Sequence, residues 1–284
     1  MHAAFSGPRG GRGREHVGSY HLLEVIGRGS RSTIYRAQAP GGELVAVKIP
    51  RPEVDRLTRA TRLMHEYAVL GRITHPNVVR LLDAGELGDG TPYLVFELVG
   101  GESLARIVER TGPLPLRRVH GLAVQLLSAC AAVHAAGFVH CDINSANLLV
   151  EATGDGEAVK LVDFSAAGLL GTLGGGGTPA YLAPELISGS APSRSSDIYA
   201  CGAVLYEMLT GTPPFTGATV RDLLLRKTLL PIDPPSSRRG GSAIAPRLDA
   251  VVLGALARIP AARPASCDEL ARAFTEALFV GVAS

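Results

Sequence analysis

Three oxygen-bearing side chains in the middle of the chain stand at the ends of apolar segments. Asp142 and Asn147 precede the apolar run at residues 148–150, and Asp163 follows a second apolar run. Carboxylate and amide oxygens suit Mg²⁺, and a carboxylate can also accept a proton. Aspartate and asparagine are equally typical of turns and helix caps, so each residue taken alone fits either interpretation.

A glycine-rich segment near the start of the chain is a candidate for phosphate binding. Residues 27–32 read Gly-Arg-Gly-Ser-Arg-Ser between two predicted strands. Glycine lets a backbone turn tightly and approach phosphate oxygens closely. An ordinary hairpin turn would have the same pattern, so this segment alone does not establish a phosphate site.

A lysine and a glutamate in apolar surroundings form a second candidate. Lys48 lies in the predicted strand at residues 44–49, where a buried amine needs an anion or water as partner. An edge-strand lysine that reaches solvent is the alternative. On the next predicted helix, Glu66 falls within an apolar face formed by Leu63, Tyr67 and Leu70, where a carboxylate is costly unless it is paired. We therefore expect Lys48 to pair with Glu66.

The elements that must position these residues change in type along the chain. Strands are predicted over residues 20–26, 33–38, 44–49, 78–84 and 93–96, and helices over 56–72, 104–110, 116–136, 195–210, 219–228, 246–257 and 267–277. A strand-rich first third therefore precedes a helical remainder. This order predicts an α+β fold with two lobes.

Composition excludes several classes of protein. With 284 residues, 46% of them apolar, the chain can bury a sizeable core, which excludes a collagen-like or wholly disordered protein. A net charge of +2 argues against nucleic acid as the main partner. The four cysteines show no CxxC spacing, so neither a structural zinc site nor a disulfide framework is expected, and a reducing, cytoplasmic setting fits best.

Neither a secretory signal nor a membrane span is expected, because no apolar run follows the basic residues near the start of the sequence. Residues 119–141 lack charged side chains and are long enough to cross a bilayer, but they hold histidines and many alanines, so a buried core helix is the better interpretation. Residues 1–19 are Gly/Arg-rich and predict a flexible tail, with an arm that contacts phosphate or membrane as the alternative.

The order of the candidate residues is more specific than any one of them. The glycine segment, Lys48, Glu66, Asp142 with Asn147, Asp163, and the run Ala183-Pro184-Glu185 follow one another along the chain. In this order the chain resembles the eukaryotic-type protein kinase family, and in composition its bacterial Ser/Thr members, from about Tyr20 to Leu278. Supporting stretches lie at residues 75–79, 177–185, 197–202 and 263–264.

This resemblance implies a two-lobed protein kinase-like fold. The kinase domain would cover residues 20–279, with a strand-rich N-lobe over about 20–97 and a helical C-lobe over about 98–279. Short tails would precede and follow it, at residues 1–19 and 280–284.

The resemblance also implies a protein kinase that transfers the γ-phosphate of ATP to Ser or Thr with Mg²⁺, or with Mn²⁺ as an alternative. Asp142 would accept the proton of the substrate hydroxyl, Lys48 would contact the α- and β-phosphates, and Asn147 and Asp163 would hold the metal. ATP would be bound by Ile26, Gly27, Gly29, Ser30, Ile34, Ala46, Lys48, Glu66, Glu97, Val99 and Leu149. The partner would be a protein substrate or the kinase itself.

The resemblance also implies roles for residues outside the ATP and metal sites. Phe96 would be the gatekeeper beside the adenine, Asp197 would brace the catalytic loop, and Glu185 would pair with Arg263. Thr178 would contact the catalytic aspartate.

The chain departs from the family pattern around the predicted phosphoryl-transfer site. Cys141 replaces an arginine that binds an activation-loop phosphate, so no such phosphorylation switch is expected. Asn144, the third predicted catalytic residue beside Asp142 and Lys48, replaces a lysine that steadies the γ-phosphate. Loss of such a donor can cost roughly 10²–10³ in rate, but asparagine can still donate a hydrogen bond, so a partial loss is expected. Ser165 replaces the glycine of Asp-Phe-Gly, and Arg31 and Ser32 replace an aromatic residue and a glycine.

Three functions remain open at this point. The first is an active Ser/Thr kinase, supported by Lys48, Glu66, Asp142, Asn147 and Asp163. The second is a pseudokinase that binds nucleotide or protein, supported by the departures at Cys141, Asn144 and Ser165. The third is a kinase for small molecules, against which the segment at residues 177–185 argues. That same segment favours Ser/Thr over Tyr as the acceptor.

Overall fold

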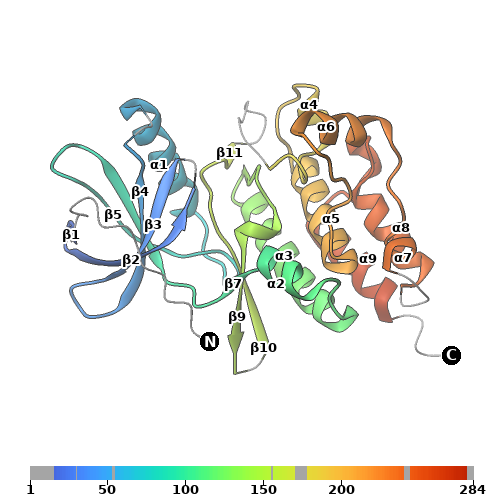
Figure 1. The fold of residues 1–284 in the computed structure, drawn as a ribbon, viewed down its shortest axis with the longest axis horizontal. Helices are drawn as coiled ribbons and strands as arrows, with labels where there is room; N and C mark the ends of the chain where they lie inside the picture. Colours follow the sequence, from blue (N-terminus) through green and yellow to red (C-terminus); the bar gives the residue numbers. More distant parts are fainter. Residues whose placement is uncertain are drawn as a thin grey trace. The chain divides into compact units, whose positions relative to one another are not determined.

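The computed structural model describes residues 16–29, 31–52, 55–154, 156–169, 178–239 and 244–279. The chain divides into two compact units (Figure 1). The first consists of Met1–Thr61 with Leu82–Leu98, and the second of Arg62–Leu81 with Val99–Ser284. The boundary falls within helix α1 (Arg56–Leu70).

The first unit is built on a six-stranded sheet with strand order β1-β2-β3-β4-β6-β5. The strands are β1 (His16–Val17), β2 (Tyr20–Arg28), β3 (Ser32–Gln38), β4 (Leu44–Pro50), β5 (Leu81–Glu86) and β6 (Pro92–Glu97). Side chains alternate between the two faces of each strand. One face carries the unit's core, which comprises Val17, Tyr20, Leu22, Ala37, Val45, Val47, Ile49, Tyr93 and Val95.

The sheet begins earlier than the sequence indicated. Residues 16–19 were expected in a flexible tail, but His16 and Val17 pair with His21 and Tyr20. Val17 is fully buried in the core, and burial of this apolar side chain explains why the strand is ordered. Residues 1–15 and 280–284 of the predicted tails lie outside the described residues.

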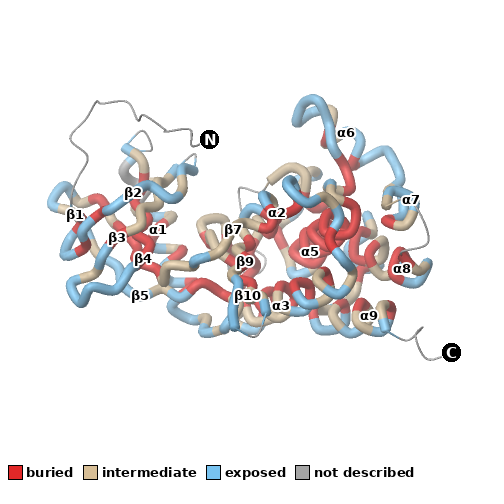
Figure 2. The backbone as a smooth tube through the Cα atoms, turned by 60° about the horizontal axis from the view of Figure 1, so that its bottom comes forward, coloured by how far each residue is buried: buried red, intermediate tan, exposed pale blue. Residues whose placement is uncertain are grey.

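The second unit is mostly helical and is centred on α5 (Arg194–Thr210). The other helices are α2 (Leu104–Thr111), α3 (Leu116–Ala135), α4 (Pro184–Ile187), α6 (Val220–Leu229), α7 (Pro235–Arg239), α8 (Pro246–Ala255) and α9 (Cys267–Phe279). Helix α3 packs against α5 and α9, and α5 packs against α8. Figure 2 shows α5 as buried along its length.

Helix α5 has clear sequence signals for its ends and for its burial. Ser193 and Ser196 form a capping box at the N-terminus, and Gly211 ends the helix with φ 83°. A Cβ atom on Gly202 would lie 2.8 Å from Ala255 Cβ, so glycine permits the close approach of α5 and α8. The helix therefore forms a fixed support for the loops packed on it.

Two small sheets hold the loops of the candidate site. Strands β9 (Leu148–Thr153) and β10 (Gly156–Leu161) form a hairpin that β7 (Glu102–Ser103) extends. Strand β8 (Phe138–Val139) pairs with β11 (Gly168–Leu169). The helix Ser145–Asn147, of 3₁₀ type, lies between β8 and β9. The sequence analysis identified the apolar runs here but did not predict the hairpin.

The predicted helices and strands agree with the structure apart from details at their ends. The strand predicted from residue 78 begins at Leu81, and Val78 instead forms an isolated bridge with Leu161. The prediction that residues 119–141 contain a buried core helix is confirmed by α3. Within the described ranges, none of the helices has the length and apolar character that crossing a bilayer requires.

One predicted helix face is wrong in a single member. On α1, Leu63, Glu66 and Leu70 are buried as expected, but the Tyr67 side chain is 43% exposed. Val69, which was not expected on the buried face, is fully buried. The buried stripe follows the i, i+3, i+7 spacing from Leu63, so Tyr67 at i+4 falls at its margin.

Candidate active site

One face of the first unit's sheet carries several of the predicted nucleotide-binding residues. Gly27 of β2 lies opposite Ile34 of β3, which lies opposite Lys48 of β4, which in turn lies opposite Leu94 of β6. Directly opposed residues project to the same face of a sheet, so these four form a row across it. Lys48 is only 4% exposed.

A second row continues the same face. Ala46, two residues before Lys48, lies opposite Phe96 of β6. Because side chains alternate along a strand, Ala46 and Phe96 share the face of Ile34 and Lys48. The face is thus opposite to the one that holds the unit's core. Glu97 pairs with Val45 at the end of β6.

The glycine-rich segment forms the turn that joins β2 to β3. The Gly29 N–H donates to the Ser32 carbonyl at 2.9 Å, and Arg51 donates to the Gly29 carbonyl. Ile26 is 47% exposed in β2. The predicted contact residue Ser30 lies outside the described residues.

In the second unit, Asp142 is the centre of a hydrogen-bond network. Its Oδ1 accepts the Thr178 N–H at 2.8 Å, the Thr178 hydroxyl at 2.9 Å and the Asn144 amide at 3.0 Å. Its Oδ2 accepts the Asn147 amide at 3.3 Å. The predicted contact of Thr178 with Asp142 is confirmed, and these bonds fix the carboxylate in one orientation.

Asn144 is held inside this network. Its side-chain Nδ2 also donates to the Asp142 carbonyl and to the Thr178 hydroxyl, at 2.9 and 3.1 Å. Its Oδ1 accepts the N–H groups of Ala146 and Asn147 and caps the 3₁₀ helix. Asn144 is only 3% exposed. Its amide therefore ties the loop together, rather than projecting from it as a long lysine could.

Asp197 of α5 accepts hydrogen bonds from two backbone N–H groups of the same loop. Its Oδ2 accepts the His140 N–H at 2.8 Å and its Oδ1 accepts the Cys141 N–H at 3.0 Å. Cys141 has φ 67°, a conformation that residues other than glycine rarely adopt and that packing must enforce. The predicted bracing of the loop by Asp197 is confirmed. Burial, with Asp197 and Asp142 nearby, raises the pKa of the Cys141 thiol to about 12.

Asp163 is, with Cys141, the second described residue other than glycine that has a positive φ, of 60°. Its neighbour Phe164 is fully buried, packs edge-on against the His140 ring and donates its N–H to Glu66 at 3.3 Å. The Val162 N–H donates to the Asn147 carbonyl at 2.9 Å. These contacts hold the segment before Asp163 against the loop that carries Asn147. Positive φ at two neighbouring polar segments is typical of functional sites.

The donor chemistry around Asn147 suits a hard divalent cation. The Asn147 Nδ2 donates to the Asp142 carbonyl at 2.9 Å, so the amide oxygen is the end that remains for a metal. Asp163 adds a carboxylate, and an amide oxygen with a carboxylate is the ligand type that Mg²⁺ prefers. The residues present therefore fit the predicted metal.

The remaining predicted residues are placed as follows. Leu149 lies in β9 opposite Ser103 and Lys160. Val99 belongs to the second unit, whereas Lys48 and Glu97 belong to the first. The pairing of Lys48 with Glu66 stays a prediction.

A buried ion pair fixes the end of the segment at residues 178–185, here called the activation segment. Arg263 Nη1 and Nη2 donate to the two carboxylate oxygens of Glu185, both at 2.7 Å. The Arg263 side chain is completely buried. The predicted pairing of these two residues is confirmed, and its two-point geometry is the strong form of such a contact.

Sequence reasoning missed two polar contacts that hold the same segment. Lys227 of α6 donates to the carbonyls of Pro179, Ala180 and Leu182 at 2.7–3.1 Å, and it is 1% exposed. Nothing in the sequence around Lys227 indicates that this lysine binds backbone carbonyls of another segment.

The second missed contact joins three buried side chains. The Tyr181 hydroxyl donates to Glu207 Oε2 at 2.8 Å and lies 2.8 Å from the Ser145 hydroxyl, which donates to Glu207 Oε1. Burial raises the pKa of the Glu207 carboxyl, although the hydrogen bonds from Tyr181 and Ser145 oppose this. The network thus joins the loop at residues 140–147, through Ser145, to the activation segment, through Tyr181, and to α5, through Glu207.

Both the fold and this constellation are those of a protein kinase. The protein kinase domain model matches residues 20–274, and the chain belongs to this family.

Among characterised relatives, the chain is similar to serine/threonine-protein kinase pkn3 of Myxococcus xanthus, at 33% identity over 273 residues. That match covers 89% of this chain and 50% of the relative. It is also similar to serine/threonine-protein kinase PknH of Mycobacterium bovis, at 38% identity over 272 residues, which cover 92% of this chain and 44% of the relative. The chain thus spans half the length of these relatives or less.

Proposed function

We propose that this chain transfers the γ-phosphate of ATP to Ser or Thr hydroxyls of proteins, with Mg²⁺ as the metal. The observation that carries the proposal is the network around Asp142, in which Thr178 and Asn147 fix the carboxylate beside the loop of Asp163. The relatives support the Ser/Thr class, because their names describe serine/threonine-protein kinases. The protein substrate, or transfer to the chain itself, is part of the proposal.

Each site residue has a distinct task in this proposal. Asp142 orients the substrate hydroxyl and takes its proton while the new O–P bond forms and ADP leaves. Asn147 and Asp163 hold Mg²⁺, which neutralises developing charge on the phosphate oxygens when bound. Lys48 contacts the α- and β-phosphates, and Glu66 keeps its amine in place.

Nucleotide contacts are proposed for the remaining residues. These are Ile26, Gly27, Gly29, Ser30, Ile34, Ala46, Glu97, Val99 and Leu149. The shared face of Gly27, Ile34, Ala46 and Lys48 supports the assignment, because one ligand could contact all four. A reducing, cytoplasmic setting is also proposed, and the four free cysteines support it.

A pseudokinase is the second candidate, and Asn144 favours it. The Asn144 amide is occupied by Asp142 and Thr178, so it is not placed to steady a γ-phosphate as a lysine would. Such a protein would bind ATP without transferring phosphate. Asn144 is accordingly assigned a positioning role in the proposal.

The experiment is γ-phosphate transfer from labelled ATP to a generic basic protein and to the chain itself. Reactions contain Mg²⁺ or Mn²⁺, and Asp142→Asn serves as the matched control because asparagine keeps the shape of aspartate but is a poor base. We expect labelling by the wild type and a loss of at least 10²-fold in Asp142→Asn. Absence of labelling in both, with a melting temperature that rises on addition of ATP, would replace the kinase with the pseudokinase.

A further inference from the structure

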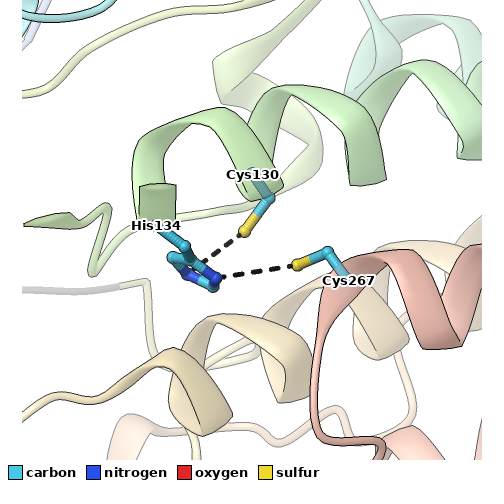
Figure 3. Close-up of side chains that lie close together, drawn as sticks. All are labelled: Cys130, His134 and Cys267. Carbon is cyan, nitrogen blue, oxygen red and sulfur yellow. Dashed lines mark hydrogen bonds between the residues drawn. The ribbon is translucent and has the colours of Figure 1, made fainter. Parts of the chain in front are cut away.

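A group of sulfur and nitrogen ligands lies inside the second unit. Cys130 and His134 lie one turn apart on the same face of α3, and Cys267 is the first residue of α9 (Figure 3). Cys201 of α5 is a further buried cysteine near these two, since it shifts the pKa of both the Cys130 and the Cys267 thiol. The three cysteines are 0–1% exposed and His134 is 5% exposed.

The spacing of these atoms matches a tetrahedral metal site. Cys267 Sγ lies 3.9 Å from His134 Nδ1, and Cys130 Sγ lies 3.5 Å from His134 Nε2. One ligand atom each from Cys130, His134 and Cys267 lies within 4.8 Å of the others. With Zn–S near 2.3 Å and Zn–N near 2.0 Å, the ligands of tetrahedral zinc lie roughly 3.5–3.8 Å apart. The distance from Cys267 Sγ to Nδ1 is therefore close to the required size, whereas the Cys130 sulfur contacts the other ring nitrogen and would shift toward Nδ1 on binding a metal.

The hydrogen bond to Asp197 selects the nitrogen that would bind the metal. His134 Nε2 lies 2.9 Å from Asp197 Oδ2, and since a carboxylate only accepts, Nε2 is the protonated donor. Nδ1 is then the nitrogen that faces Cys267, at 3.9 Å, and it releases the proton it carries when a metal binds. A carboxylate behind a metal-binding histidine is the usual arrangement in metal sites, because it fixes the ring and its tautomer.

The environment also favours a thiolate at Cys267. Its place at the start of α9 puts the sulfur near the positive end of the helix dipole. Arg194 brings a positive charge to the site, since it donates to the His134 carbonyl at 3.1 Å.

We propose that Cys130, Cys201, Cys267 and Nδ1 of His134 bind one Zn²⁺ ion as a closed, four-coordinate structural site. Sulfur and imidazole ligands without a water position are those of structural zinc, and they are too soft for Mg²⁺ or Ca²⁺. Binding releases the remaining thiol protons to solvent and leaves three thiolates on the ion. The site would join α3, α5 and α9.

Hydrogen bonds through Asp197 connect the proposed site to the loop at residues 140–147, which carries Asp142. Asp197 accepts hydrogen bonds from His134 and from the backbone N–H groups of His140 and Cys141, which immediately precede Asp142. A metal on Nδ1 would hold the His134 ring and so hold Asp197 in place. Zinc would thus stabilise the support of the active-site loop without contact with any substrate.

The first experiment measures metal on the full chain. Purified wild type is analysed for zinc by mass spectrometry and, after chelation, is titrated with Co²⁺ and read by its absorption spectrum. We expect one zinc per chain, and with Co²⁺ the strong sulfur-to-cobalt bands and tetrahedral d–d bands. A folded wild type that retains no zinc and shows no such bands overturns the proposal without any variant.

Variants identify the ligands. Cys201→Ser and Cys267→Ser should lose the bound zinc, whereas Cys141→Ser, which alters the one cysteine outside the cluster, should keep it. Asp197→Asn should weaken Co²⁺ affinity by roughly 10–100-fold, because it removes the partner of the histidine. Zinc content unchanged in both cluster variants would overturn the proposal, as would a disulfide between two cluster cysteines in the purified wild type.

Discussion

The Asp142 carboxylate accepts two hydrogen bonds from Thr178, one from the backbone N–H at 2.8 Å and one from the hydroxyl at 2.9 Å. A single residue of the activation segment thus fixes the Asp142 carboxylate by both its main chain and its side chain. The backbone bond is independent of side-chain identity, but the hydroxyl bond is not. The two contributions can therefore be separated by substitution.

Thr178→Val should lower phosphate transfer while leaving the fold intact. A hydrogen bond to a charged group contributes about 1.5–3 kcal/mol, which corresponds to a roughly 10- to 100-fold fall in kcat/KM. Thr178→Ser keeps the hydroxyl and should retain most of the activity. Equal activity in the valine and serine variants, measured with labelled ATP, would contradict a role for this hydroxyl.

Asn144 can be tested by a pair of substitutions with different consequences. Asn144→Ala removes the cap of the 3₁₀ helix and the bonds to Asp142 and Thr178, so it should lower both stability, by about 1–2 kcal/mol, and turnover. Asn144→Lys loses the same cap but restores the cation that the family pattern has here. We expect it to raise kcat, with roughly 10²–10³ as the upper limit. Unchanged kcat in the lysine variant would refute our interpretation of Asn144.

Loss of the Glu185–Arg263 pair should destabilise the second unit strongly. Removing one partner of a buried ion pair typically costs about 3–5 kcal/mol, because the other charge remains buried. Arg263→Gln removes the cation and the two parallel bonds at 2.7 Å, and should show most of this loss in chemical denaturation. As a control, Arg110→Gln breaks the exposed pair with Glu102 and should change stability little. Similar losses of unfolding free energy in the two variants would show that the Glu185–Arg263 pair does not stabilise the second unit.

The burial of Lys227 predicts that the free energy of unfolding rises with pH. Burial lowers the pKa of this lysine from 10.5 to about 7. Between these values the unfolded chain keeps a proton that the folded chain releases, so the unfolding free energy rises with pH. The stability of the wild type relative to Lys227→Met should therefore increase from about pH 7 to about pH 10 in denaturant titrations.

The matched control for this profile lies on the same helix. Arg226 is exposed, and its substitution removes no buried amine, so Arg226→Met should give a difference from the wild type that does not vary with pH. A flat profile for Lys227→Met would mean that Lys227 stays charged in the folded protein. Its three carbonyl partners would then outweigh its burial.

Contacts close in sequence were largely predictable. Asp142, Asn144 and Asn147 lie within one short loop, so their mutual hydrogen bonds follow from spacing once the loop forms. The pairing of Glu185 with Arg263 was also predicted, although 78 positions separate them, because each belongs to a motif of the family. The face of α1 was predicted less well, since periodicity alone does not place the margin at Tyr67.

Contacts that depend on helix packing could not be predicted in the same way. Lys227 binds carbonyls 45–48 positions earlier, and backbone carbonyls carry no residue type that a sequence pattern could detect. The start of the sheet at His16 was missed because burial of Val17 depends on strands that follow it.

The sequence alone determined the family, the order of the elements and the identity of the predicted catalytic residues, because these reside in short motifs with fixed spacing. The tertiary structure alone decided which distant side chains meet. The three cysteines of the cluster come from α3, α5 and α9, and their spacing in the chain argued against a metal site. Packing of these helices brings the sulfur atoms of Cys130 and Cys267 to one histidine, and spatial proximity rather than spacing in the chain determines which groups can share a ligand.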